Sequence, residues 1–134
     1  MILIDANILM YAAGAPHRYK QPSARLLQRI ADGDVDAFID AELLQEILHR
    51  YRAIGRWTDG RLVYDFARQI FPTVLPITAD VMDRARELLD VHDGMMARDA
   101  LHAAVVLTEG LDAICSYDRD FDGIVGLRRT EPDG

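Results

Sequence analysis

Short apolar runs alternate along this chain with longer segments of helical periodicity, and this alternation limits the folds that the chain can adopt. The apolar runs are Ile2–Ile4, Ala37–Ile39, Val74–Ile77 and Ala113–Cys115, with a weaker fifth at Leu127–Thr130. Strands that read as uninterrupted apolar runs are usually buried on both faces. The pattern therefore predicts an α/β fold with a mostly parallel sheet covered by helices.

Capping residues and glycines set the expected bounds of the helices. We expect helices at Tyr19–Asp32, Ala41 to about Ile54, Thr58 to about Phe71, Ala79–Val91 and Ala97–Glu109. Asp40, Thr58 and Thr78 stand where a side chain can cap a helix N-terminus. Gly33 and Gly110 stand where a helix ends.

The length of 134 residues predicts one domain, spanning residues 1–134. A single cysteine, Cys115, excludes a disulfide framework and a cysteine-rich zinc site. No apolar run is long enough for a membrane span, and Met1 leads directly into Ile-Leu-Ile-Asp without the basic start of a signal peptide. We therefore expect a cytoplasmic protein that does not bind membranes.

The formal net charge of −7, from 15 basic and 22 acidic residues, argues against a broad basic surface for nucleic acid. The basic side chains are nevertheless all arginine except Lys20. Because the guanidinium group suits phosphate, a local patch of arginines can still hold a phosphodiester.

Acidic and polar residues follow two of the most apolar strands. Asp5 and Asn7 come after the first strand, and Ser116 and Asp118 come after the fourth, with Asp120 and Asp122 beyond. Because parallel strands end at the same edge of a sheet, we expect Asp5 and Asp118 to lie close together. A single acid at such a position is more commonly a helix cap or a solvated loop residue.

Two helical acids are further candidates. Glu46 lies about 60° beyond the edge of the apolar arc of its helix and can reach the sheet edge; the alternatives are an ion pair with Arg50, or Glu42 in the same role. Asp99 lies in the first turn of an alanine-rich helix that can pack closely on the sheet. His102 is three residues later and could bond Asp99, although a lone histidine there is more commonly structural.

Converging carboxylates repel one another, which a divalent cation would relieve. Oxygen ligands with few histidines or cysteines select Mg²⁺ or Mn²⁺. Such an ion can activate water against a phosphodiester.

The ordered set of these residues resembles the PIN-domain ribonucleases. The matching pieces are Ile-Asp5-Ala-Asn7, the helix containing Leu-Gln-Glu46-Ile-Leu-His-Arg, Arg-Asp99-Ala-Leu-His-Ala-Ala and Ser116-Tyr-Asp118-Arg-Asp120-Phe-Asp122, which together span nearly the whole chain. The resemblance implies a Rossmann-like three-layer α/β/α fold and metal-dependent cleavage of RNA by activated water, leaving 5′-phosphate and 3′-hydroxyl ends. Small members are mostly VapC-type toxins, usually homodimers, that a VapB-type antitoxin holds inactive.

Carried over to this sequence, the resemblance implies that Asp5, Glu46, Asp99 and Asp118 form the acidic quartet that holds Mg²⁺ or Mn²⁺. Asn7 and Ser116 match supporting polar residues, and Asp120 and Asp122 are further candidates to share metal binding with Asp118. Basic residues of the less acidic half are candidates to bind single-stranded or structured RNA: Arg18, Lys20, Arg50, Arg52, Arg56 and Arg61. We expect an apolar partner surface near residues 19–32 and 41–71, with Tyr51, Trp57 and Tyr64 as possible anchors.

Other functions remain open. The chain could be an RNA-processing nuclease that is not a toxin, or a binding module that uses the acidic pocket without catalysis. A phosphatase of the haloacid dehalogenase type would need an acid where Asn7 stands, and a receiver domain would need a lysine after a late strand, whereas Lys20 is near the start.

Overall fold

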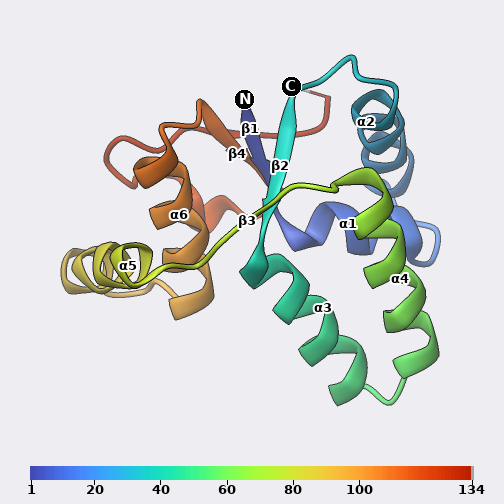
Figure 1. Ribbon diagram of the computed structural model, residues 1–134, viewed down its shortest axis with the longest axis horizontal. Coiled ribbons are helices and arrows are strands. Elements are labelled where there is room, and N and C mark those ends of the chain that lie inside the picture. The colour runs from blue at the N-terminus through green and yellow to red at the C-terminus, as the bar shows by residue number, and fades with distance from the viewer. Residues whose placement is uncertain (134) are drawn as a thin grey trace.

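The computed structural model describes residues 1–133, in which strands alternate with helices (Figure 1). The elements, in chain order, are β1 (Ile2–Ile4), α1 (Ala6–Ala13), α2 (Lys20–Ala31), β2 (Ala37–Asp40), α3 (Ala41–Ala53), α4 (Trp57–Ile70), β3 (Val74–Leu75), α5 (Ala79–Val91), α6 (Ala97–Glu109), β4 (Ala113–Cys115), the 3₁₀ turn η1 (Arg119–Phe121) and β5 (Arg129–Thr130).

The strands form one parallel sheet in the order β3-β2-β1-β4-β5. β1 is central and pairs with β2 and β4, with Leu3 opposite Phe38 on one side and Ile114 on the other. The predicted α/β class and parallel sheet are therefore confirmed. The carboxyl ends of β1 and β4 meet at one edge of the sheet, because Ile4 is in register with Cys115.

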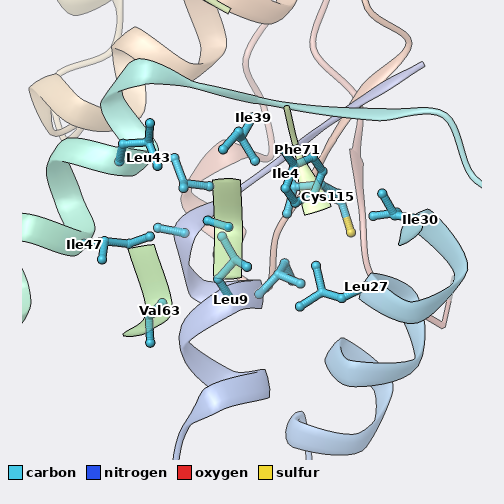
Figure 2. Packing of buried hydrophobic residues seen from close by; sticks show 14 of the residues in the cluster. Ile4, Leu9, Leu27, Ile30, Ile39, Leu43, Ile47, Val63, Phe71 and Cys115 are labelled. Atoms are coloured by element: carbon cyan, nitrogen blue, oxygen red, sulfur yellow. The ribbon is translucent and has the colours of Figure 1, made fainter. Parts of the chain in front are cut away.

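Helices cover both faces of the sheet, which gives three layers (Figure 1). Ile4, Ile39 and Cys115 face α1–α4, where they pack with residues such as Leu43 and Ile47 (Figure 2). The neighbouring strand residues Leu3 and Ile114 face α5 and α6. This alternation follows from the period of two in a strand, and it explains why both strands are apolar throughout.

Local signals set most helix bounds as expected. Asp40 Oδ1 accepts a hydrogen bond from Leu43 N at 2.9 Å, and Thr78 Oγ1 accepts one from Val81 N at 3.2 Å, so both residues cap their helices. Gly110 ends α6 in the left-handed conformation, at φ 66°. Among the described residues, no helix is both long and apolar enough to cross a membrane.

Three local expectations were wrong. Thr58 does not cap a helix, because α4 already begins at Trp57 and Arg56 occupies the cap position. The third and fifth strands are two residues each, shorter than the apolar runs suggest. Helix α1 was not predicted, because Ile8, Leu9 and Met10 make its centre apolar on all sides and remove the helical periodicity.

Candidate metal centre

A cleft of about 510 Å³ opens at the carboxyl ends of β1 and β4 and brings the four predicted acids together. Asp5 enters it from the end of β1, Glu46 from α3, Asp99 from the first turn of α6, and Asp118 from the loop after β4. Asn7 and Arg50 also line it. The fold thus brings together acids that are distant in the chain: Asp5 and Asp118 are 113 positions apart.

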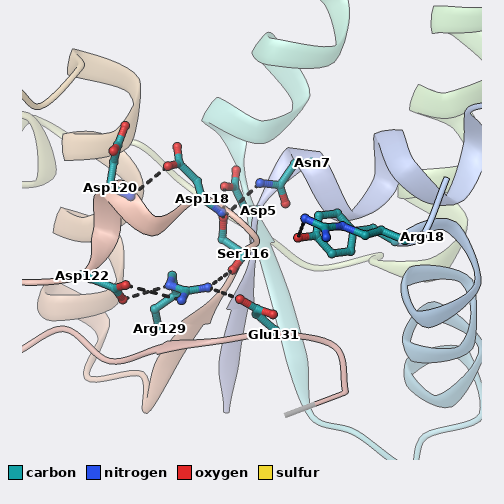
Figure 3. Close-up of polar contacts among 10 residues, drawn as sticks. Asp5, Asn7, Arg18, Ser116, Asp118, Asp120, Asp122, Arg129 and Glu131 are labelled. Carbon is teal, nitrogen blue, oxygen red and sulfur yellow. Dashed lines mark hydrogen bonds and ion pairs between the residues drawn. The ribbon is translucent and has the colours of Figure 1, made fainter.

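Ser116 connects the two strand ends. Its hydroxyl donates to Asp5 Oδ2 at 2.6 Å and accepts from Asn7 Nδ2 and from the Asp118 backbone N–H, both at 3.0 Å (Figure 3). A serine hydroxyl has one donor and two acceptor positions, and all of them are used. Asp5 Oδ1 also accepts from Ala6 N at 2.7 Å, so Asp5 both caps α1 and lines the cleft.

The acidic segment after β4 divides between two environments. Asp118 lines the cleft, and its Oδ1 accepts from Asp120 N at 2.9 Å. Carboxylate oxygens of Asp99, Asp118 and Asp120 lie within 4.8 Å of one another, as ligands of one ion would. Asp122 instead forms an ion pair with Arg129, 2.9 Å from its Nε (Figure 3). The placement favours Asp120 over Asp122 as the supporting acid, while the metal role of either remains a prediction.

The side chain of Glu46 is hydrogen-bonded to buried His102. Its Oε1 lies 2.6 Å from His102 Nε2, and His102 Nδ1 lies 2.7 Å from Asp40 Oδ2. The bond that His102 could form with Asp99 is absent from the described contacts, because the imidazole contacts Glu46 of α3 and Asp40 of β2 instead. Glu46 thus contacts His102 rather than pairing with Arg50, whereas half-buried Glu42 does not line the cleft.

Burial lowers the pKa of His102, but the charge of Asp40 and the hydrogen bonds to Asp40 and Glu46 outweigh it and raise that pKa well above its ordinary value of 6.5. Both ring nitrogens of His102 are thus hydrogen-bonded to carboxylates. With both ring nitrogens engaged, His102 has no free lone pair for a metal ion.

The pKa values of two carboxyl groups in the cleft are raised. Burial, together with the nearby charges of Asp118 and Asp5, raises the pKa of Asp99 to about 6. Burial likewise raises the pKa of Asp5. Asn7 Oδ1 is buried without a hydrogen-bond partner, which adds an unused oxygen at the cleft. An all-oxygen donor set with repelling charges fits a divalent cation such as Mg²⁺ or Mn²⁺.

The predicted RNA-binding residues lie in different places, some at the cleft and others away from it. Arg50 lines the cleft, together with His49 and Arg98. Arg18 lies over the Tyr19 ring, 4.6 Å from its centroid, and Lys20 Nζ donates to the Ala12 carbonyl at 3.0 Å. Arg52 lies 5.9 Å from the Trp57 ring. Of the predicted RNA-binding residues Arg18, Lys20, Arg50 and Arg52, Arg50 alone lines the cleft.

Three contributors escaped the sequence reasoning. Asp40 was assigned only a capping role, although its second oxygen binds His102. Arg98 precedes Asp99 directly, and that neighbour was the available signal. No local pattern in the sequence indicates the role of Arg129. It donates to the Ser116 carbonyl at 3.0 Å and to Glu131 at 2.6 Å, and so connects β5 to the loop after β4, here called the site loop (Figure 3).

Comparison with known structures shows the same fold. VapC20 of Mycobacterium tuberculosis, described as a sarcin-ricin loop cleaving toxin, superposes with a TM-score of 0.75 at 20% identity, covering 96% of this chain and 99% of that one. VapBC2 of Rickettsia felis, bound to a DNA fragment from its promoter, gives 0.75 at 18% identity with 98% of each chain covered. FitAcB of Neisseria gonorrhoeae gives 0.74 at 16% identity, again with 98% of each chain covered.

Sequence comparison is more specific. The PIN domain family model matches residues 2–127. Ribonuclease VapC13 of Mycobacterium tuberculosis is 40% identical over 129 residues, which cover 96% of this chain and 98% of that protein. Ribonuclease VapC23 of the same species is 30% identical over 118 residues, 88% of this chain and 93% of that protein. The chain therefore belongs to the PIN domain family and, within it, to the VapC-type proteins.

Proposed function

We propose that this chain is a Mg²⁺- or Mn²⁺-dependent endoribonuclease and the toxin of a VapBC-type toxin–antitoxin pair. The observation that carries the proposal is the convergence of Asp5, Glu46, Asp99 and Asp118 on one cleft. Full-length similarity to proteins named VapC ribonucleases supports RNA as the substrate.

Each acid has a distinct place in the proposed chemistry. Asp5, Asp99 and Asp118 would hold the cation, with Glu46 completing the set. When bound, a divalent cation neutralises phosphate charge and lowers the pKa of water to generate a nucleophile. Ser116 orients Asp5 by donating to its Oδ2, and Asn7 holds the Ser116 hydroxyl by donating to it, so that the Asp5 carboxylate does not need to reorganise when substrate arrives.

Arg50, Arg98 and His49 are placed to bind the RNA backbone. All three line the same cleft as the acids, and the two arginines supply positive charge beside them. Arginine can donate two hydrogen bonds to one phosphate, which both binds and orients it. Arg18, Lys20 and Arg52 remain proposals for more distant contacts, since none of them lines the cleft.

We further propose a VapB-type antitoxin as the partner and a homodimer as the assembly, in the cytoplasm. A separate apolar groove of about 470 Å³ between α1, α2 and α4 offers a surface for an amphipathic segment. Its rim includes Leu62, 62% exposed, and Phe66, 44% exposed. The expected anchors lie elsewhere: Tyr51 is buried, and Trp57 and Tyr64 do not line this groove.

The proposed activity is tested by incubating purified protein with end-labelled single-stranded and hairpin RNAs and Mn²⁺ or Mg²⁺. We expect cleavage that EDTA stops and that Asp5→Asn abolishes, whereas Asp34→Asn, an exposed carboxylate between α2 and β2, cleaves normally. Cleavage that continues in EDTA contradicts metal dependence. No cleavage by the wild-type protein favours the alternative of a binding module.

The toxin role is tested separately by induced expression in a bacterial host. We expect growth arrest by the wild-type protein and none by Asp5→Asn. Normal growth despite RNA cleavage in vitro would instead identify an RNA-processing nuclease.

A further inference from the structure

The proposed metal chemistry does not explain one buried chain of hydrogen-bonded polar side chains. Asp40, His102 and Glu46 come from β2, α6 and α3, and the side chains of the first two are 0% exposed. Buried polar groups of this kind are costly unless each has a partner. Here each has one, with distances of 2.7 Å from Asp40 to His102 and 2.6 Å from His102 to Glu46.

Asp40 is a rigid anchor for this chain. It ends β2, which pairs with the central strand β1, and its Oδ1 caps α3 through Leu43 N. Its other oxygen, Oδ2, binds His102 Nδ1. The imidazole is therefore held at one end by a residue that both the sheet and α3 fix in place, and a ring held in this way cannot turn without breaking that bond.

The other end of the imidazole acts on Glu46. A glutamate has several rotatable side-chain bonds, and ordering it costs conformational entropy. The bond from His102 Nε2 restrains Oε1, while the side chain remains 16% exposed at the cleft. The nearest oxygen of Asp5 is 3.8 Å from Nε2, too far for a hydrogen bond, so the restraint falls on Glu46.

We propose that His102 is a positioning residue, and that the hydrogen-bonded chain Asp40–His102–Glu46 presents the Glu46 carboxylate to the cleft in one orientation. This inference rests on the proposed nuclease function, because it gives Glu46 a reason to be held. Groups that orient a ligand from behind are commonly worth 10- to 100-fold in metal affinity or activity, to order of magnitude. His102 would act through Glu46 alone, without touching substrate.

Two variants that place a neutral amide at position 102 distinguish a positioning role of His102 from a structural one. The amide of His102→Asn lies near the place of Nδ1 and reaches Asp40, whereas that of His102→Gln extends to the place of Nε2 and reaches Glu46. Both variants lose the imidazole ring and both stay polar. A structural role predicts equal losses in the two, whereas a positioning role predicts that glutamine rescues.

The experiment measures Mn²⁺ binding by titration calorimetry, and kcat and KM for a labelled RNA. We expect His102→Asn to weaken Mn²⁺ binding by roughly 10- to 100-fold and to lower kcat with little change in KM, and His102→Gln to retain most of both. Val105→Ala, a buried change on the same helix, controls for lost stability and should bind Mn²⁺ normally. Equal losses in the asparagine and glutamine variants overturn the proposal.

A measurement on the wild-type protein covers the case in which neither variant folds. With ¹⁵N-labelled histidine, NMR should show two ring N–H protons of His102 protected from exchange with water. Glu46→Ala should expose the Nε2 proton and leave the Nδ1 proton protected. An unprotected Nε2 proton in the wild-type protein refutes the positioning role. If both protons are protected but the wild-type protein neither binds Mn²⁺ nor cleaves RNA, the proposed function is refuted instead.

Discussion

Single side chains decide how the acidic cleft is held, and Ser116 shows this most directly. Its hydroxyl joins Asp5 and Asn7, from the start of α1, to Asp118, from the loop after β4, by three hydrogen bonds. Because Ser116 is fully buried, water cannot replace it as a partner. Removal of the hydroxyl would leave buried donors and an acceptor without partners, which costs more than the bonds themselves contribute.

We expect Ser116→Ala to lower the free energy of unfolding by about 1–3 kcal/mol and to reduce RNA cleavage, because Asp5 loses its restraint. Urea denaturation and a cleavage assay measure the two effects. Thr78→Ala is the matched control, since it removes a capping hydroxyl far from the cleft at a cost of about 1 kcal/mol. A similar fall in cleavage in this control would contradict a local role for Ser116.

The raised pKa of Asp99 gives a test in the metal-free protein. With its folded pKa at about 6, above the unfolded value of 3.8, Asp99 lowers the free energy of unfolding progressively as pH rises from about 3.8 to about 6, and the loss is complete above that range. In EDTA at pH 7.5, Asp99→Asn should be more stable than the wild-type protein by on the order of 2 kcal/mol. The difference should shrink toward pH 4.5, and equal stability at pH 7.5 would contradict it.

At the scale of elements, α3 depends on a close approach to α4. A side chain at Gly60, in α4, would place its Cβ 2.4 Å from Tyr51 Cβ, in α3. The two helices therefore meet at this glycine because only hydrogen fits between them. Since α3 carries Glu46 and Arg50, the crossing also sets one wall of the cleft.

We expect Gly60→Ala to lower the free energy of unfolding by about 1–3 kcal/mol, because it forces the two helices apart. Thermal unfolding measures the effect. Gly94→Ala, where a Cβ would meet no atom within 4 Å, is the control and should change little. Equal stability of the Gly60 and Gly94 variants would show that α3 and α4 adjust without strain.

At the scale of the whole molecule, a protein of net charge −7 must bind a polyanion if it is a ribonuclease. The average field is repulsive, so binding depends on the local positive charges of Arg50 and Arg98 at the cleft. Neutralised phosphates release counterions, which makes such binding dependent on salt.

We therefore expect Arg98→Ala to raise KM for RNA with little change in kcat, and to reduce the slope of log affinity against log salt by about one. Arg86→Ala, an exposed residue on α5 that pairs with Asp90, is the control and should leave KM unchanged. Binding measured by fluorescence anisotropy at several salt concentrations checks both. An unchanged slope in the Arg98 variant would contradict contact with phosphate.

Much of the architecture could be predicted from local pattern. Apolar runs identified the strands of the sheet, and Asp40 and Thr78 identified helix starts, because capping depends on neighbours within three residues. The meeting of Asp5 and Asp118 also followed from sequence, since parallel strands end at the same edge. Helix α1 could not be predicted from the sequence. Its eight residues are apolar except for Asn7, so they show neither the periodicity of a helix nor that of a strand.

The sequence by itself determined which acids could meet, because their positions at strand ends and on helix faces follow from short-range periodicity. Only the tertiary structure decided what holds them. His102 turns to Asp40, 62 residues away, rather than to Asp99, three residues away, because the packing of α6 beside α3 sets the direction of the ring. Arg129 reaches the site loop from β5 for the same reason: a side-chain contact between distant elements depends on how they pack, and no local pattern encodes it.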